Sequence, residues 1–299
     1  MNIAITGGTG LVGRALTRQL QQHGHDVTIL TRGESKTEDG ITYVQYLQDG
    51  ASPEDHLQHI DGFVNLAGVS LNSGRWTEET KTAIYESRID ATEEVLRIIR
   101  HMEKPPHVLI NASAVGIYPP SKVKEYTEQE TALSDDFLGT TVRHWEATAN
   151  KASDYGVRVA MARFGVILHK DAQSLQLMAL PYKLGVGGRI GSGQQWLSWV
   201  HVDDVARAIY FAIEQEEIVG PFNVVSPRPM TMQAFGATLA QVLTSPHWLP
   251  VPEFALKLAL GEKSTLVVDG QFVQPDVLQK HGFRFQYEDA KRALQQIFH

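Results

Sequence analysis

The sequence contains no cysteine, which excludes disulfides, thiolate metal ligands and thiol nucleophiles. It also lacks a basic excess, since its net charge is −7, and a protein that binds the phosphate backbone of a nucleic acid needs a basic face. No run approaches the roughly 18 continuous apolar residues of a membrane helix. The first strand pattern begins at Asn2, so we expect no signal or transit peptide before it. These absences predict a soluble cytoplasmic protein that binds neither nucleic acid nor membrane.

A glycine-rich turn near the N-terminus is the most informative stretch that is present. Residues 2–6 form a short apolar run, as a buried parallel strand does, and residues 11–22 show apolar positions at helical spacing. Between and within them lie Gly7, Gly10 and Gly13 in the pattern G-x-x-G-x-x-G. Such glycines permit a sharp turn, let backbone amides approach a pyrophosphate and allow close helix–strand packing. The pattern indicates a dinucleotide site, although a tight turn that binds no ligand can have the same glycine pattern.

The residue after the second predicted strand, residues 26–31, bears on which dinucleotide binds. An NAD site usually has an Asp or Glu there for the ribose 2′-hydroxyl, whereas this chain has Arg32. A guanidinium can pair with a 2′-phosphate, which an acid would repel. Arg32 can equally be a solvated loop residue, but the pattern favours NADP over NAD. Thr6 and Thr9 add hydroxyl donors near the same phosphates.

Strands and helices continue to alternate along the first half of the chain, which implies a parallel sheet covered on both faces. The sequence therefore predicts an α/β fold, a Rossmann-type doubly wound parallel sheet. The further strands are expected at residues 41–46, 62–66, 107–112 and 158–163, and the helices at residues 77–100 and 135–155.

After about residue 164 glycine and proline become denser and helical patterns predominate. We expect an NADP-binding domain over residues 1–165, with sheet contributions from about 198–226, and a smaller, interleaved substrate lobe over residues 166–299. A strand is expected at residues 222–225. The cleft between sheet and lobe is the expected site of a small-molecule substrate. Helices are expected at residues 204–214, capped by Asp203, and at 231–243, 252–260 and 287–298.

Nine segments carry a resemblance to a known family. The chain resembles the extended short-chain dehydrogenases/reductases, the superfamily of nucleotide-sugar epimerases and dehydratases, and more narrowly its atypical subgroup labelled "epimerase family protein". The broader match lies in TGGTGLVG (6–13), NLAG (65–68), NASAVGIYP (111–119), RFGVIL (163–168), SWVHVDDVARAI (198–209) and FNVVSP (222–227). The closer match lies in GRWTEETKTAIYESRIDAT (74–92), GQQWLSWVHVDD (193–204) and PDVLQKHGFRF (275–285).

The resemblance implies the fold and NADP binding. We also expect a monomer or homodimer and no metal site. The cofactor-binding residues that we predict are Thr6, Gly7, Gly8, Thr9, Gly10, Leu11, Val12, Gly13, Arg32, Leu66, Ala67, Gly68, Arg88, Ala112, Ser113 and Arg163.

The family's catalytic Tyr-x-x-x-Lys pair works from one face of a helix, where the Lys lowers the pKa of the phenol. YPPSK, residues 118–122, matches the Tyr-x-x-x-Lys motif, but it is not expected to be helical because Pro120 disfavours a helix. Anchoring on Glu146 instead places Leu138 and Val142 at the family's two positions. Neither side chain can exchange a proton, so the standard pair is predicted to be absent.

Other groups remain as candidates for chemistry. Ser113 and Tyr118 are the predicted catalytic residues. Ser113 lies near where the family's Ser or Thr holds a substrate oxygen, although spacing counted from the family's Tyr position puts Ala114 there instead. Tyr118 is expected either as a donor in the cleft or as packing. Arg88 is expected to bind an anion or to join a salt bridge. The remaining candidates have structural alternatives that we favour: Arg143, His144 and Glu146 on a solvated helix face, and His201 with Asp203 and Asp204 as a buried histidine and helix cap rather than a metal site.

Three functions compete. The first is an NADP-dependent, epimerase-like oxidoreductase of a small, possibly nucleotide-sugar-like substrate, with Tyr118, a water or the substrate itself replacing the missing pair. The second is a non-catalytic sensor or regulator that binds NADP(H). The third, a scaffold without a nucleotide, is disfavoured by the intact glycines and Arg32.

Overall fold

The central sheet has eight strands in the order β12-β8-β6-β5-β1-β2-β4-β3, in a computed structural model that describes residues 1–57 and 59–299. Neighbouring strands are parallel except β3, which pairs antiparallel with β4. The strand order reverses at β1, and ligands of such sheets bind beyond the carboxyl ends of the strands at this point. The strands are β1 (Asn2–Thr6), β2 (Asp26–Thr31), β3 (Lys36–Glu38), β4 (Ile41–Gln45), β5 (Gly62–Asn65), β6 (Val108–Ala114), β8 (Arg158–Phe164) and β12 (Gly220–Val224).

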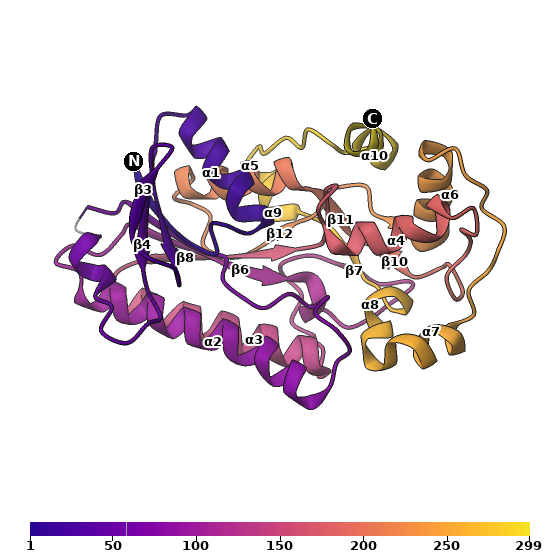
Figure 1. The fold of residues 1–299 in the computed structure, drawn as a ribbon, viewed down its shortest axis with the longest axis horizontal. Coiled ribbons are helices and arrows are strands. Elements are labelled where there is room, and N and C mark those ends of the chain that lie inside the picture. Colours follow the sequence, from indigo (N-terminus) through magenta and orange to yellow (C-terminus); the bar gives the residue numbers. More distant parts are fainter. Residues whose placement is uncertain (58) are drawn as a thin grey trace.

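Helices cover both faces of the sheet, as Figure 1 shows. On one face α1 (Leu11–Gln22) packs against α5 (Val202–Glu214) over a core that includes Leu16 and Ile209. On the other face lie α2 (Glu78–His101) and α3 (Phe137–Asn150), where Val95 and Ile99 pack over the sheet residues Phe63 and Leu109. The doubly wound parallel sheet predicted from the sequence is confirmed.

A third core holds the C-terminal lobe together. It includes the fully buried Trp199 and Leu239, between α4 (Gln173–Lys183), α6 (Met232–Val242) and α10 (Ala290–Phe298). The shorter helices are α7 (Glu253–Leu260), α8 (Thr265–Val268) and α9 (Asp276–Lys280). Three strand pairs complete the lobe: β9 (Val166–Leu168) with β11 (Trp199–His201), β10 (Trp196–Leu197) with β13 (Met230–Thr231), and β7 (Glu125–Tyr126) with β14 (Phe272–Val273).

The two halves of the chain share the sheet, because β12 pairs with β8 and α9 contacts β12. The strand expected at residues 222–225 is therefore confirmed, whereas the domain boundaries stay a prediction. No helix among residues 1–57 and 59–299 is long and apolar enough to cross a membrane.

Three predicted local features, at residues 118–122, 135–155 and 203, can be compared with the structure. The segment at residues 118–122 is not helical, as Pro120 predicts. The predicted helix over residues 135–155 is α3 followed by a 3-10 turn, Lys151–Tyr155. The cap of α5 was placed wrongly: His201, not Asp203, is the N-cap, and its ring accepts a hydrogen bond from the Asp203 backbone.

Candidate functional site

The turn between β1 and α1 leaves the first backbone amides of the helix open. Gly10 is the N-cap of α1, and no side chain of the described residues caps it. Gly7 has φ +66°, and a Cβ there would lie 2.6 Å from the Leu66 carbonyl oxygen. A Cβ on Gly13 would lie 2.5 Å from the Gly7 oxygen, so both positions need glycine. An uncapped helix N-terminus with closely packed backbone is the arrangement that receives a pyrophosphate.

The neighbouring residues of the turn frame the same opening. Thr9 and Gly10 are exposed, and Leu11 and Val12 are half-buried at the start of α1. Gly8 is buried, because a Cβ there would lie 2.7 Å from the Ile29 side chain. The turn thus leaves the first backbone amides of α1 without a side-chain cap, and Arg14 Nη1 donates to the Thr9 carbonyl beside it at 2.6 Å.

Arg32 lies directly after β2, whose end is level with the end of β1 because Leu30 pairs with Thr6. Its side chain is exposed and makes no ion pair or hydrogen bond within the described part of the chain. Arg32 is also close enough to Tyr46 to oppose the burial that raises the pKa of that phenol to about 12. A guanidinium without a carboxylate partner at this edge fits a phosphate ligand.

Thr6 lies beneath that opening with its hydroxyl bonded inside the fold, and its contact with a phosphate stays a prediction. The residue is fully buried and its hydroxyl donates to Asn65 Oδ1 at 2.6 Å. Asn65 in turn donates to Asn111 Oδ1 at 2.7 Å and to Thr92 Oγ1 at 2.9 Å. The amides therefore tie β1, β5, β6 and α2 together beneath the site. Asparagine within apolar strand runs was the sequence signal for this network.

Arg88 of α2 borders the segment that follows β5. Its Nη1 donates to the carbonyls of Ile84 at 2.7 Å and Val69 at 3.1 Å, and its guanidinium lies 5.2 Å from the Trp145 ring centre. No carboxylate among residues 1–57 and 59–299 pairs with it, and burial lowers the pKa of Arg88 to about 10. Gly68 is exposed, and a Cβ there would lie 3.3 Å from the Arg88 side chain. The salt-bridge alternative is thus wrong for the described residues, and the anion alternative stays a prediction.

The carboxyl ends of β6 and β8 carry a buried polar cluster of five residues, which we call the Arg163 cluster: Ser113, Tyr118, Glu146, Arg163 and Asn223. Arg163 donates to both Glu146 oxygens at 2.8 Å, and Nη1 donates to the Tyr118 hydroxyl at 2.9 Å. Although burial opposes its charge, these contacts raise the pKa of Arg163. Tyr118 donates to Asn223 Oδ1 at 2.9 Å, and Ser113 donates to Glu146 at 2.5 Å.

This geometry bears on the predicted roles of Tyr118, Ser113 and Arg163, which stay predictions. Tyr118 is fully buried, with a pKa that burial raises, and its only proton is engaged by Asn223. The packing alternative for Tyr118 therefore fits the structure, and the donor alternative does not. Ser113 is 2% exposed and Arg163 is 5% exposed. Ser113 donates its hydroxyl proton to Glu146, and Arg163 donates to Glu146 and to the Tyr118 hydroxyl. Neither offers a free group to a cofactor or substrate. Ala112, at 5% exposure, has no polar side chain to offer either.

Apolar side chains occupy the two positions of the missing pair. Val142 is buried, and Leu138 is half-buried with its Cβ 3.6 Å from the position of a Cβ on Gly116. Ala114, at the end of β6, is half-buried. No Tyr or Lys lies between Phe137 and Asn150. The wall of the site at α3 thus contains no proton donor at these positions.

The helix-face expectation for α3 holds for two of its three residues. Arg143 pairs with the exposed Asp135 at 3.0 Å, and His144 contacts the Tyr85 hydroxyl at 3.1 Å. Glu146 is instead 8% exposed, because its partners Ser113 and Arg163 lie on neighbouring strands. Sequence spacing along the helix carried no signal for these long-range partners.

The segment His201–Asp204 forms the buried histidine and helix cap that we favoured over a metal site. Besides capping α5, His201 is 1% exposed and contacts Gln296 Oε1 at 2.9 Å. Asp204 accepts from Arg207 at 2.6 Å and from the backbone of Tyr287 at 2.8 Å. Within the described residues no group of three His, Asp or Glu side chains is arranged to hold a metal ion.

Leu66 and Ala67 are half-buried between the Gly7 turn and Gly68. Together with Thr9, Gly10 and the following residues of α1, they border one edge of the sheet at the strand-order reversal. The structure thus brings together most of the predicted cofactor residues. It leaves Thr6, Ala112, Ser113 and Arg163 beneath the surface.

Comparison with known proteins shows the family of this chain. The model of the NAD-dependent epimerase/dehydratase family matches residues 3–225, and that of a domain of unknown function (DUF1731) matches residues 251–297. The chain is 50% identical over 298 residues to the epimerase family protein YfhF of Bacillus subtilis, covering 99% of this chain and 98% of the relative. It is 44% identical to the epimerase family protein SH2119 of Staphylococcus haemolyticus, covering 98% of this chain and 97% of the relative.

Solved structures give the same result. The human epimerase family protein SDR39U1, solved with NADPH, superposes with a TM-score of 0.88 at 30% identity over 99% of each chain. A nucleoside-diphosphate sugar epimerase from Corynebacterium glutamicum gives a TM-score of 0.79 at 32% identity, over 99% of this chain and 58% of that one.

Proposed function

Because this chain belongs to the NAD-dependent epimerase/dehydratase family, we propose that it is an NADP(H)-binding, epimerase-like oxidoreductase of a small-molecule substrate. The observation that carries the proposal is the uncapped N-terminus of α1 beside Arg32, which has no partner within the described residues. The human relative solved with NADPH supports the same choice of cofactor.

The residues present fit such a cofactor. Gly7 and Gly13 leave space that a Cβ would fill, so the first-turn backbone amides of α1, from Leu11 onward, are positioned for a pyrophosphate. Arg32 is positioned for a 2′-phosphate, because it follows β2 and has no competing carboxylate in the described chain. Arg88 supplies a second unpaired cation, beside Gly68. NAD is less favourable, because Arg32, rather than an acid that could bind a ribose hydroxyl, directly follows β2.

The nicotinamide, when bound, supplies or accepts a hydride, and the protein's own residues decide where the accompanying proton comes from. Leu138 and Val142 cannot provide it, and the Tyr118 proton is held by Asn223. We therefore assign the proton to solvent or to the substrate itself. General acid catalysis contributes typically 10²–10⁴-fold, so its absence favours a substrate that accepts hydride readily.

The absence of a proton donor at Leu138 and Val142 also supports a second candidate, a non-catalytic NADP(H) sensor. A protein that keeps its cofactor site and places every polar side chain of the Arg163 cluster in structural hydrogen bonds meets the needs of a regulator. The localisation that we propose is cytoplasmic, and the assembly a monomer or homodimer.

One experiment separates the two functions. The fluorescence of bound NADPH is followed after addition of a library of aldehydes, ketones and nucleotide-sugar ketones. Decay with matching loss of absorbance at the nicotinamide band indicates hydride transfer, which supports the oxidoreductase. Constant fluorescence with every compound, in protein that binds NADPH, contradicts turnover and leaves the sensor.

A further inference from the structure

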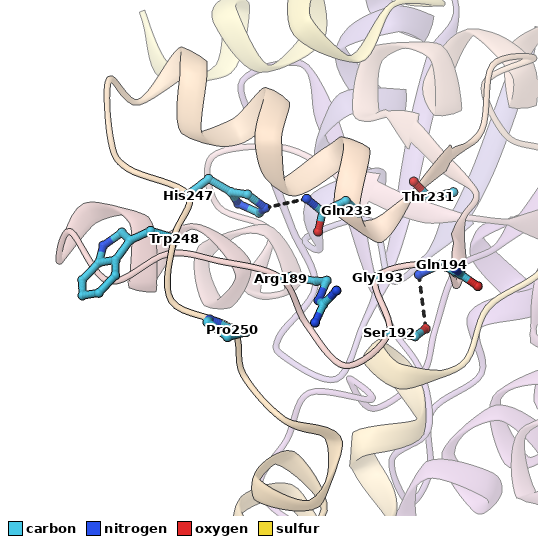
Figure 2. A pocket seen from close by; sticks show the side chains of 9 residues that line it. All are labelled: Arg189, Ser192, Gly193, Gln194, Thr231, Gln233, His247, Trp248 and Pro250. Carbon is cyan, nitrogen blue, oxygen red and sulfur yellow. Dashed lines mark hydrogen bonds between the residues drawn. The ribbon is translucent and has the colours of Figure 1, made fainter.

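Two adjoining hollows lie on the C-terminal lobe, along one side of α6. Their volumes are about 550 and 620 Å³, within the range of small-ligand sites, and both are lined by His247. Figure 2 shows the first hollow, in which Arg189, Gln194 and Gln233 surround the opening below His247. The second continues along α6 to Lys291 of α10. All residues that line the two hollows belong to residues 189–291, and none is a predicted cofactor residue.

The lining is basic in an acidic protein. Arg189 and Lys291 lie in different hollows, and none of the described residues that line either one is Asp or Glu. The whole chain has a net charge of −7, so most of its surface repels an anion. Glu253, which lies 3.9 Å from the position of a Cβ on Gly191, is already paired with Lys257 at 2.7 Å. The two cations of the hollows are therefore left without neutralising partners in the described chain.

The fold holds Arg189 in place although its guanidinium has no partner. The Arg189 carbonyl accepts from Val251 at 2.8 Å, and Gly191 donates to the Val251 carbonyl at 2.9 Å, which fixes the backbone on both sides. A Cβ on Gly193 would lie 2.9 Å from Arg189 Cγ, so the absence of a side chain there makes room for the stem of the arginine. Within residues 1–57 and 59–299 the side chains of Arg189 and Gln194 make no hydrogen bond. Their donors are therefore available to a ligand.

His247 fixes the boundary between the two hollows. Its Nδ1 lies 3.0 Å from the Tyr182 hydroxyl and its Nε2 lies 3.1 Å from Gln233 Nε2. The imidazole stacks parallel on Tyr182, with ring centres 5.9 Å apart. A ligand that passes from one hollow to the other must cross this ordered imidazole and the Gln233 amide. That part of the path suits hydroxyl groups better than a hydrocarbon.

We propose that the joined hollows bind a small polyol with two anionic groups, of the sugar bisphosphate class. Arg189 binds one phosphate, as the planar guanidinium does best, and Lys291 binds the second. His247 and Gln233 contact the hydroxyl-rich centre. The site is separate from the proposed cofactor site and does not depend on it.

The test is calorimetric titration of the full-length protein with fructose 1,6-bisphosphate, glucose 6-phosphate and inorganic phosphate, each with and without saturating NADPH. The bisphosphate should bind one site per chain with NADPH present. Arg189→Ala should weaken it about tenfold or more, and Lys291→Ala about three- to tenfold. Glucose 6-phosphate, with one phosphate, should lose affinity with Arg189→Ala and little with Lys291→Ala.

Matched controls remove the same charge elsewhere on the protein. Arg284→Ala and Lys280→Ala each delete an exposed cation that has no side-chain partner in the described chain, and each should change affinity less than about twofold. Equal losses in the variants and the controls would show nonspecific charge attraction and overturn the site. Loss of binding in saturating NADPH would place the anion in the cofactor site instead, and absence of binding to the wild type would also refute the proposal.

Discussion

The two halves of the sheet's carboxyl edge have opposite character. At β1 and β2 the first-turn amides of α1 have no side-chain cap, and the exposed Arg32 guanidinium has no partner in the described chain. At β6 and β8 the polar side chains of the Arg163 cluster are buried and bonded to one another. Donors left unsatisfied mark a place for a ligand, whereas satisfied ones stabilise the fold.

The comparison fits the proposal that this chain binds a nicotinamide cofactor without the family's usual proton donor. In this chain the residues of the Arg163 cluster, at the ends of β6 and β8, hydrogen-bond to one another and stabilise the fold. A buried arginine needs its carboxylate, and Tyr118 and Ser113 supply the remaining hydrogen bonds. Substitutions on the two sides should therefore have separable effects, stability on one and ligand affinity on the other.

The largest effect on stability is expected from Arg163→Ala. It leaves Glu146 buried without its cation, and removing one partner of a buried pair costs about 3–5 kcal/mol. Urea unfolding followed by circular dichroism measures the loss. Arg143→Ala, which breaks an exposed pair with Asp135, is the control and should cost about 0–1 kcal/mol. If the two variants were equally stable, the Arg163 cluster would not be the structural unit described above.

Gly13→Ala should have the largest effect on binding. The added Cβ would lie 2.5 Å from the Gly7 oxygen and the Gly8 Cα, so the turn must open and its amides move. We expect NADPH affinity to fall about 100-fold or more, or about 2.7 kcal/mol, in fluorescence titration. Gly33→Ala, where the nearest atom is 3.5 Å away, should change affinity little. Wild-type affinity in Gly13→Ala would show that the cofactor does not use this turn.

Tyr118→Phe separates structure from catalysis. Without the hydroxyl, Asn223 Oδ1 and one Arg163 nitrogen lose a partner, so the free energy of unfolding should fall by about 1–3 kcal/mol. If the protein turns over, its rate per folded molecule and the pH dependence of that rate should stay unchanged. A rate loss of about 100-fold in stable protein would make Tyr118 the proton donor after all.

The smallest effect concerns Glu128, which supports Asn223. Its Oε1 accepts from the Asn223 backbone at 2.7 Å, while Oε2 is buried without a partner among the described residues, and burial raises the pKa of the carboxyl. The folded state then binds the proton more tightly than the unfolded state does, so stability decreases as pH rises from about 4.5 through the raised pKa.

Glu128→Gln should remove this slope. Urea unfolding at a series of pH values should show the wild type losing less than about 1 kcal/mol relative to the variant between pH 4.5 and 7. The opposite slope would mean that the carboxylate is stabilised in the folded state.

Local patterns predicted most of the fold. The bounds of β1, α1 and β2 agree with the apolar runs and the glycines that end them. α4 was missed because Pro181 lies inside it and because Leu177 and Leu180 are half exposed, which blurs the apolar stripe. The short strand pairs of the lobe were missed because two or three residues carry no periodicity.

The site divides in the same way. The glycine turn and Arg32 are adjacent in sequence, so their spacing alone indicated a cofactor site. The Arg163 cluster joins residues far apart in the chain: Tyr118 bonds to Asn223 across 105 positions, and Ser113 bonds to Glu146 across 33. The sequence around Tyr118 contains no signal that separates a tyrosine exposed in a cleft from one whose hydroxyl donates to a distant residue such as Asn223. The absence of Tyr and Lys from α3, by contrast, was visible in the sequence.

The most direct test of the account is the affinity of Arg32→Ala for NADPH and NADH, each compared with the wild type. The account predicts that NADPH binding weakens at least about tenfold, because a charge-assisted contact with the 2′-phosphate is lost, while NADH binding changes less than about twofold. Equal losses for the two cofactors, or no loss for either, would contradict it.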